Sequence, residues 1–220
     1  MGQSFNVVWE DIHSSQEWGA YPAEHVIRFI ARNYYGFERN NVKILDFGCG
    51  AGAHTWYLAR EGFDVYAFDG SQSAIKRTQA RLERDGLSAN LKVTDALDTG
   101  YPDDFFDAVV DNFCIYSNLT ENIQSMYKGI WSILKPQGRL CTACFGKRTT
   151  GYGKGELLEK DTYTNLTEGA LAGRGITHFF SKEALKMILS QAGFHDIHID
   201  TILYTDNQNQ VEQYIARAAK

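Results

Sequence analysis

Three closely spaced glycines follow an apolar run that contains a carboxylate, in the stretch ILDFGCGAGAHT at residues 44–55. The glycines are Gly48, Gly50 and Gly52, and the carboxylate is Asp46. Glycine has no Cβ, so a turn of this composition brings backbone close to a ligand. The spacing alone leaves that ligand open between a dinucleotide, a phosphate and another molecule.

Two further carboxylates narrow the choice of ligand. Asp69 ends the next apolar run, FDVYAFD, and suits a ribose diol, whether that of NAD or that of S-adenosylmethionine. Asp95 ends the third run, NLKVTDA, and is placed to take an adenine amino group. Asp46 would repel a diphosphate, whereas it can accept hydrogen bonds from an ammonium group. A P-loop is excluded because no Gly-Lys-Ser/Thr follows the turn. Together the carboxylates favour a ligand with an ammonium group, a ribose and an adenine, which describes S-adenosylmethionine.

The elements that must position these residues alternate along the chain. Helical spacing predicts helices over residues 23–37, 54–60, 71–86, 121–138 and 181–194, with Ser71 or Ser73 and Ser181 as N-caps and Pro136 as a stop. Apolar runs predict strands over 41–48, 63–69, 90–96, 105–117 and 138–146, which is typical of a parallel sheet covered on both faces. Segments 195–205 and 210–219 favour a closing hairpin, where a dinucleotide fold would need a second mononucleotide-binding half.

Five motifs in order, ILDFGCGAG, VYAFDGS, VTDAL, FDAVVDNF and LKPQGRL, resemble those of class I S-adenosylmethionine-dependent methyltransferases of the small stand-alone kind (methyltransferase types 11, 12 and 25). The resemblance implies an α/β, doubly wound, mostly parallel seven-stranded sheet of the Rossmann-like methyltransferase fold, with a C-terminal antiparallel hairpin. It also favours a single domain over residues 1–220. Residues 1–40 would form a helical lid segment, and the aperiodic insertion 146–180 would form a substrate lid.

The resemblance also implies a set of cofactor-binding residues. The methionine portion would contact Asp46, the glycine turn, and the backbone of Asp111 and Asn112, while Asp69 would bind the ribose and Asp95 would border the adenine. The full predicted set is Asp46, Gly48, Cys49, Gly50, Gly52, His54, Thr55, Asp69, Gly70, Ser71, Asp95, Ala96, Leu97, Asp111, Asn112 and Tyr21.

The expected chemistry is in-line displacement of a methyl group onto an O- or N-nucleophile of a small molecule, mainly through proximity and orientation. A base is needed only for a nucleophile that must lose a proton. The candidate catalytic residues are His178, His13 and Tyr116. Aromatic candidates for the lid lining are Trp9, Trp18, Tyr21, Tyr116, Tyr152, Tyr163 and Phe179. The alternatives are an NAD-dependent dehydrogenase and a non-catalytic module that binds S-adenosylmethionine, and the sequence does not name the methyl acceptor.

Composition restricts the classes of partner and the cellular location that we expect for the protein. The formal net charge of −5 and the absence of any Lys/Arg run longer than a pair argue against nucleic acid. No stretch reaches about 18 consecutive apolar residues, so no membrane span is expected. The start of the chain lacks the features of a signal peptide, and the four cysteines favour reduced core thiols, so a cytoplasmic protein, monomeric or homodimeric, is expected. The Cys-x-x-Cys of CTAC lies in a strand-like run, where its two side chains point to opposite faces, and no metal site is predicted there.

Overall fold

Helices and strands alternate along the chain in the computed structural model, which describes residues 4–17 and 19–220. The helices are α1 (Val8–Ser15), α2 (Glu24–Tyr34), the short 3-10 helix η1 (Arg39–Asn41), α3 (Ala53–Arg60), α4 (Gln72–Arg84), α5 (Thr120–Ile133) and α6 (Lys182–Gln191). The strands are β1 (Lys43–Phe47), β2 (Asp64–Asp69), β3 (Asn90–Val93), β4 (Phe106–Asn112), β5 (Leu134–Phe145), β6 (Glu156–Glu159), β7 (Thr162–Thr164), β8 (Thr177–His178), β9 (His195–Asp206) and β10 (Asn209–Ala219).

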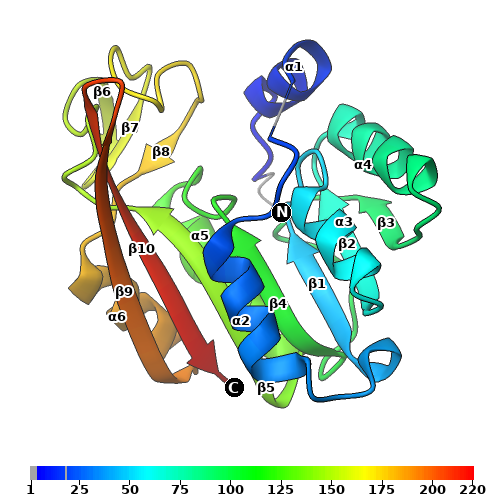
Figure 1. Cartoon of the computed structure of the whole chain (residues 1–220). Helices are drawn as coiled ribbons and strands as arrows, with labels where there is room; N and C mark the ends of the chain where they lie inside the picture. Colours follow the sequence, from blue (N-terminus) through cyan, green and yellow to red (C-terminus); the bar gives the residue numbers. More distant parts are fainter. Residues whose placement is uncertain (1–3, 18) are drawn as a thin grey trace.

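Seven strands form one twisted sheet in the order β3-β2-β1-β4-β5-β10-β9 (Figure 1). The pairings among β1 to β5 are parallel, whereas β10 runs antiparallel to both β5 and β9. The predicted fold class and the C-terminal hairpin are therefore confirmed. In the part of the chain that the structure describes, this antiparallel hairpin stands at the edge of the sheet where a classical dinucleotide fold continues its second parallel half.

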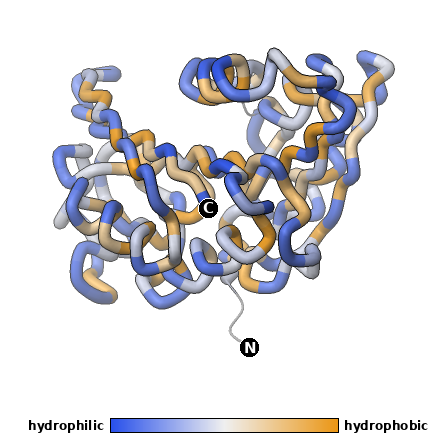
Figure 2. The backbone as a smooth tube through the Cα atoms, turned by 90° about the horizontal axis from the view of Figure 1, so that it is seen from below, coloured by the Kyte–Doolittle hydropathy of each residue, from blue (hydrophilic) through white to orange (hydrophobic). Residues whose placement is uncertain are grey.

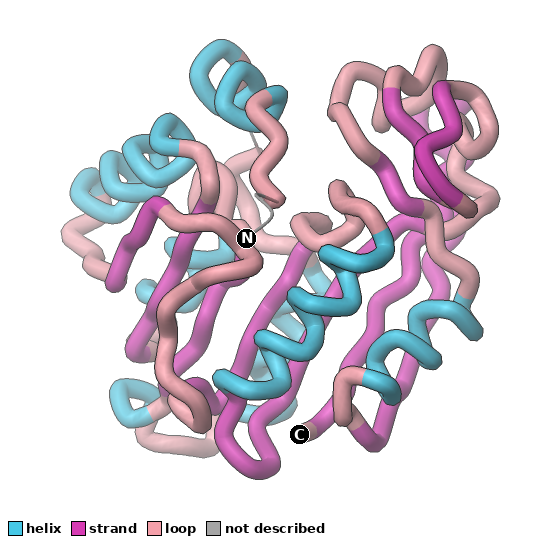
Figure 3. The backbone as a smooth tube through the Cα atoms, turned by 180° about the vertical axis from the view of Figure 1, so that it is seen from behind, coloured by secondary structure: helices cyan, strands magenta, loops and turns pink. Residues whose placement is uncertain are grey.

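Alternating strand residues bury against two helical layers, one on each face of the sheet. Ile44 packs in a cluster with Phe29 of α2 and Leu58 of α3, whereas the next residue, Leu45, packs in a cluster with Ile130 of α5. Figures 1 and 3 show α2 on one face and α5 and α6 on the other. Both faces are covered, so the central strands are apolar throughout, as expected for a parallel sheet. The hydrophobic segments of the tube stand out against the hydrophilic outer turns in Figure 2.

Helix boundaries follow local capping chemistry, with one correction. The Ser71 hydroxyl accepts from the Ala74 N–H at 3.0 Å and caps α4, and Ser181 caps α6 in the same way through Ala184. The predicted helix over 121–138 is too long. Helix α5 ends at Ile133, and Pro136 lies inside β5, because Leu134 already has extended backbone and pairs with Phe106.

The insertion 146–180 contains a small antiparallel sheet that the sequence pattern does not indicate. Strands β6, β7 and β8 pair in that order, and β8 has only two residues. The strands are too short for an alternating pattern to stand out, which explains the absence of a clear period. Figure 1 shows this sheet at the same end of the molecule as α1.

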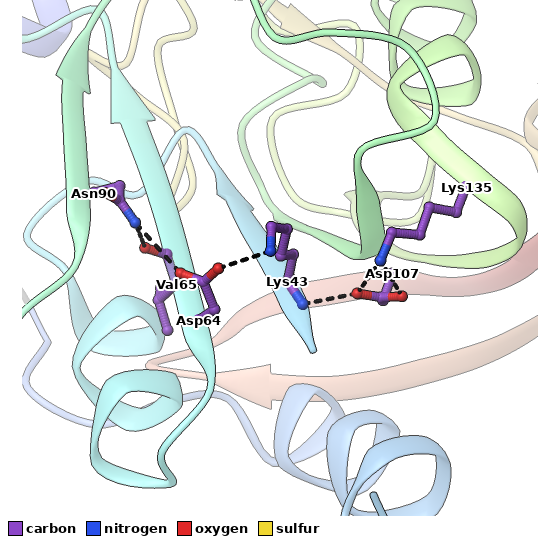
Figure 4. Close-up of polar contacts among 6 residues, drawn as sticks. All are labelled: Lys43, Asp64, Val65, Asn90, Asp107 and Lys135. Atoms are coloured by element: carbon purple, nitrogen blue, oxygen red, sulfur yellow. Dashed lines mark hydrogen bonds and ion pairs between the residues drawn. The ribbon is translucent and has the colours of Figure 1, made fainter. Parts of the chain in front are cut away.

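A polar network joins the amino ends of the parallel strands (Figure 4). The Lys43 N–H donates to Asp107 Oδ2 at 2.8 Å, and the Lys43 ammonium pairs with Asp64 at 3.2 Å. Lys135 binds both carboxylate oxygens of Asp107, at 2.7 and 2.8 Å. These pairs are half-exposed, so each contributes only about 0–1 kcal/mol to stability. They lie at the end of the sheet opposite the glycine turn and Asp69, and we assign them a structural role.

The four cysteines are free. Cys141 packs in the cluster under α2 and Cys144 in the cluster under α5, so the two side chains of CTAC lie on opposite faces of β5 as predicted.

Candidate functional site

A cavity of about 250 Å³ opens at the carboxyl ends of β1, β2 and β4. Its lining comes from the glycine turn after β1, the end of β2, the loop after β4, α1 and the insertion. Ligands of open α/β sheets bind in this position, because loops at the carboxyl ends of the strands leave a crevice there.

The backbone conformation of the turn and the atoms packed against it explain why these three positions are glycine. Gly48 has φ of 69°, and a Cβ there would lie 2.1 Å from Cys114 Sγ. Gly50 has φ of 53°, and a Cβ there would lie 3.3 Å from His13 Cε1. Gly52 caps α3 at φ of 77°, and a Cβ there would overlap Thr78. Of these three glycines, Gly48 and Gly50 line the cavity and Gly52 lies outside its lining.

Asp69 is the carboxylate that faces the cavity. Its Oδ2 accepts the Gly50 N–H at 2.9 Å, and its Oδ1 accepts the Ser71 N–H at 2.8 Å. Burial raises the pKa of this carboxyl, and the two backbone hydrogen bonds and His13 oppose the rise. Each carboxylate oxygen can accept two hydrogen bonds, so both retain capacity for a pair of hydroxyl donors.

Asp46 and Asp111 lie beneath the cavity, and neither lines it. Asp46 Oδ2 accepts the Thr55 hydroxyl at 2.6 Å, which ties β1 to α3. Asp111 accepts the Cys114 N–H at 2.9 Å and the Thr142 hydroxyl at 2.5 Å. Burial raises the pKa of each carboxyl to about 6. The role of Asp46 as an ammonium acceptor stays a prediction that these contacts do not support.

The N-terminal segment covers the part of the cavity near β3. Asp95 accepts the Ser4 hydroxyl at 2.7 Å and the N–H groups of Ser4 and Phe5 at 2.8 and 3.0 Å. The Phe5 ring packs on Gly70, where a Cβ would lie 2.1 Å from Phe5 Cδ2. Asp95 does not line the cavity, and its contact with an adenine stays a prediction.

Glu10 fastens α1 to the first turn of α4. Its carboxylate accepts the hydroxyls of Ser71 and Ser73 at 2.6 and 2.5 Å, and the Ser73 N–H at 3.2 Å. These hydrogen bonds lower the pKa of Glu10, because they favour its charged form at a helix N-terminus. We call this contact the Glu10 latch.

The Glu10 latch is expected to open in acid. A carboxyl whose pKa is lower in the folded state stabilises the docked helix above its ordinary pKa of 4.5, and the stabilisation is lost as pH falls through the folded value. Amide hydrogen exchange of residues 8–15 should therefore stay slow from pH 7 to 5 and quicken below about 4.5, after correction for the intrinsic rate. In Glu10→Gln, exchange should be faster at pH 7, and the change in exchange below about pH 4.5 should be smaller than in the wild type. An unchanged exchange rate in this variant would show that the latch does not hold α1.

Two neutral histidines tie α2 to the cavity floor. The Ala23 N–H donates to His54 Nε2 at 3.1 Å, so the proton of this imidazole lies on Nδ1. His25 Nε2 and Asn112 Oδ1 lie 2.8 Å apart, so the imidazole donates to the amide oxygen. Burial lowers the pKa of both histidines to about 4. His54 and Asn112 line the cavity, and their role as cofactor neighbours stays a prediction.

The other half of the cavity is aromatic. Trp9, Phe113, Tyr116 and Phe145 contribute rings to the lining. The Trp9 indole N–H donates to the Ser117 hydroxyl at 3.0 Å, and that hydroxyl donates to the Ile176 carbonyl at 2.9 Å. This relay joins α1, the loop after β4 and the insertion around one wall.

The three predicted catalytic residues do not all lie at the cavity. His13 and Tyr116 line the cavity, whereas His178 does not. His178 is buried inside the insertion, where Nδ1 lies 2.7 Å from the Thr162 hydroxyl and the ring packs edge-on against Phe180. Burial lowers the pKa of His178 and of His13. The role of His178 as a base stays a prediction without geometric support.

The residues predicted to bind the cofactor also fall into two groups, those that line the cavity and those that do not. Those that line the cavity are Gly48, Cys49, Gly50, His54, Asp69, Gly70, Ala96 and Asn112. Those outside its lining are Asp46, Gly52, Thr55, Ser71, Asp95, Leu97, Asp111 and Tyr21. Tyr21 is 83% exposed, and Trp18 lies outside the described residues. Sequence reasoning missed Phe5, Glu10 and Arg174, because each acts through contacts with distant parts of the chain.

Comparison with known proteins agrees with this geometry. Residues 44–138 match the sequence model of a family described as "Methyltransferase domain". The match runs from β1 through the start of β5 and includes Asp69 and Asn112. Within these residues the chain is similar to a methyltransferase domain, and the match covers less than half of the chain.

Two curated proteins to which the chain is similar have different names for what they methylate. The chain is 25% identical to the mitochondrial ubiquinone biosynthesis O-methyltransferase of Bos taurus, over 97% of the chain and 60% of that protein. It is also 25% identical to a tRNA N(3)-cytidine methyltransferase of Gallus gallus, over 78% of the chain and 48% of that protein. The chain thus spans about half to three-fifths of the length of these relatives.

The methyltransferase fold also recurs among solved structures. A SAM-dependent methyltransferase from Methanosarcina mazei superimposes with a TM-score of 0.72 at 23% identity, covering 87% of this chain and 96% of that one. This likeness establishes the fold.

Proposed function

We propose that this protein transfers a methyl group from S-adenosylmethionine to a small-molecule acceptor. The observation that carries the proposal is the cavity itself, with Asp69 and the glycine turn at one side and an aromatic wall at the other. The match of residues 44–138 to a methyltransferase-domain model and the methyltransferases to which the chain is similar support the same reaction.

The residues present fit this cofactor. Asp69 retains acceptor capacity for two ribose hydroxyls, and Gly50 leaves space that a Cβ would take. His54 carries its proton on Nδ1 and lines the cavity, so it can donate to a carboxylate of the methionine portion. When bound, S-adenosylmethionine supplies a methyl group on a sulfonium, which is already an excellent leaving group.

The protein's own contribution is to orient the acceptor and to exclude water. Trp9 and the Glu10 latch hold α1 over the cavity, while the edge-to-face rings of Tyr116 and Phe145 offer an apolar wall to an acceptor. Proximity and orientation can account for about 7–11 kcal/mol of barrier reduction in well-aligned reactions. His13 lies beside Gly50, and we propose it as the residue that takes a proton from an acceptor that must lose one.

Cofactor binding separates this function from a dehydrogenase. S-adenosylhomocysteine at millimolar concentration should raise the melting temperature by several degrees, because a ligand that binds only the folded state stabilises it by mass action. NADH at the same concentration should leave the melting temperature unchanged. Stabilisation by NADH alone would overturn the proposal, and S-adenosylhomocysteine binding without methyl transfer to any acceptor in a broad metabolite panel would favour a non-catalytic module.

For the partners and the cellular location of the protein we propose only general classes. The net charge of −5 supports a small molecule rather than nucleic acid as the main acceptor. Across residues 4–17 and 19–220, none of the helices is long and apolar enough to cross a membrane. Cytoplasmic location and a monomeric or homodimeric state stay predictions.

A further inference from the structure

Strand β9 (His195–Asp206) leaves one long edge of the seven-stranded sheet uncovered. It stands at the end of the strand order, and its inner side pairs with β10 (Figure 1). Every residue from 200 to 206 is exposed. Within the described part of the chain, no backbone hydrogen bond outside the ladder with β10 involves these residues. Their outward N–H and C=O groups can therefore pair with another strand.

The opposite edge, β3, has features that protect a sheet edge, and β9 lacks them. Strand β3 has 4 residues and includes Lys92, whose ammonium donates to the Thr99 carbonyl at 2.7 Å. Short strands and lysines discourage pairing with another chain. Strand β9 has 12 residues, HDIHIDTILYTD, with no lysine, arginine or proline. Its exposed apolar side chains are Ile202, Leu203 and Tyr204, at 40%, 43% and 43% exposure.

The charge pattern of β9 fits a second copy of the same strand in one register. Two identical antiparallel strands related by a two-fold axis place one residue opposite its own copy. The axis must pass through the exposed stretch 200–206, and an axis beyond Leu203 leaves only the end of β9 paired. An axis at residue 200, 201 or 203 sets two aspartates opposite each other, which is repulsive.

An axis at Ile202 opposes no like charges. Asp200 then faces Tyr204 of the second copy, and His198 faces Asp206. The exposed Ile202 side chains meet at the axis itself, where each covers the other. Charge and apolar surface therefore favour the same register.

We infer that β9 pairs with β9 of a second copy of this chain, antiparallel and with Ile202 on the two-fold axis, so that the two sheets join into one. The partner strand satisfies the outward backbone groups of β9 and covers its exposed apolar side chains. Both copies use the same strand, and the edges that remain are the protected β3 strands, so association stops at the dimer. This inference is independent of the cofactor and of the proposed function.

Sedimentation velocity of the full chain tests whether a dimer forms and whether β9 forms it. The wild type should convert from monomer to dimer as its concentration rises to about 100 µM, where even a micromolar Kd populates the dimer. Ile202→Lys sets two ammonium groups against each other and should raise the dimer Kd by about tenfold or more. Val93→Lys is the matched control, because Val93 is 42% exposed in β3 at the opposite edge, and it should associate as the wild type does. A wild type that stays monomeric, or an unchanged dimer Kd in Ile202→Lys, would overturn the inference.

Disulfide cross-linking tests the register with substitutions that add no charge. Directly opposed residues of an antiparallel pair have Cα atoms about 4.5–5.5 Å apart, which suits a disulfide. Ile202→Cys should therefore form a covalent dimer under mild oxidation. Thr201→Cys should not, because Thr201 faces Leu203 of the second copy and lies about 7–8 Å from its own copy. The wild type, whose four cysteines are free, shows the background under the same oxidation. No covalent dimer of Ile202→Cys above this background, or equal cross-linking of Thr201→Cys, would show that the inferred pairing is wrong.

Discussion

Asp69→Ala is expected to weaken S-adenosylhomocysteine binding by about a hundredfold or more. Hydrogen bonds to a charged group are worth about 1.5–3 kcal/mol each, and this carboxylate has capacity for two ribose hydroxyls. The change also leaves the N–H groups of Gly50 and Ser71 without their acceptor, so the turn loses one link to β2 while the Cys49 N–H still donates to the Phe68 carbonyl. Isothermal titration calorimetry on the purified protein measures the change in Kd.

Two matched variants make this result interpretable. Asp69→Asn keeps a side-chain acceptor for one backbone N–H, so it should fold more stably than Asp69→Ala while still binding the ligand weakly. Asp64 lies at the other end of β2 and pairs with Lys43 away from the cavity, so Asp64→Ala should leave the Kd unchanged. An Asp69→Ala protein that binds within about threefold of the wild type would remove this residue from the cofactor site.

Gly48→Ala is expected to lower the free energy of unfolding by about 2–5 kcal/mol. A left-handed backbone costs a non-glycine residue about 1–2 kcal/mol, and overpacking a buried site adds about 1–3 kcal/mol. Gly48 combines both penalties, because its φ is 69° and the new Cβ would lie 2.1 Å from Cys114 Sγ. Urea unfolding measures the difference, with the midpoint and slope fitted together.

Gly86→Ala is the control for backbone conformation. Gly86 has φ of 65°, and nothing lies within 4 Å of the position its Cβ would take. This variant should therefore cost only about 1–2 kcal/mol. Cys114→Gly introduced alongside Gly48→Ala should recover part of the loss, because it removes the overlapping side chain. Equal costs at Gly48 and Gly86 would show that the turn does not need the close approach to Cys114.

Local sequence signals predicted most of the fold. Runs of apolar residues, serine caps and the closing hairpin depend on neighbours along the chain, and periodicity reports on them directly. The predictions that failed concern segments in which no long hydrophobic periodicity marks the element or its end. The two residues of β8 are too few to show alternation, and α5 ended at Ile133 because pairing with Phe106 draws Leu134 into β5. Tertiary contact outweighed the proline as a helix stop.

Sequence reasoning predicted those residues of the candidate site whose position depends only on the end of one strand. Asp69 and Gly50 face the cavity because they end or follow adjacent parallel strands, whose carboxyl ends meet at one edge. Asp95 shows the limit of this reasoning. It also follows a strand, but its carboxylate accepts from Ser4, 91 positions earlier in the chain. A contact over that separation leaves no periodic signal.

The sequence by itself determined the order of elements, the glycine turn and the carboxylate at the end of β2, because each arises from short-range chemistry. Only the tertiary structure decided which polar groups face the cavity and which lie beneath it, as Asp46 and Asp111 do. It also brought Glu10 onto α4 and Arg174 beside Tyr116. These contacts join segments far apart in the chain, and only the packing of the whole fold determines which of them meet.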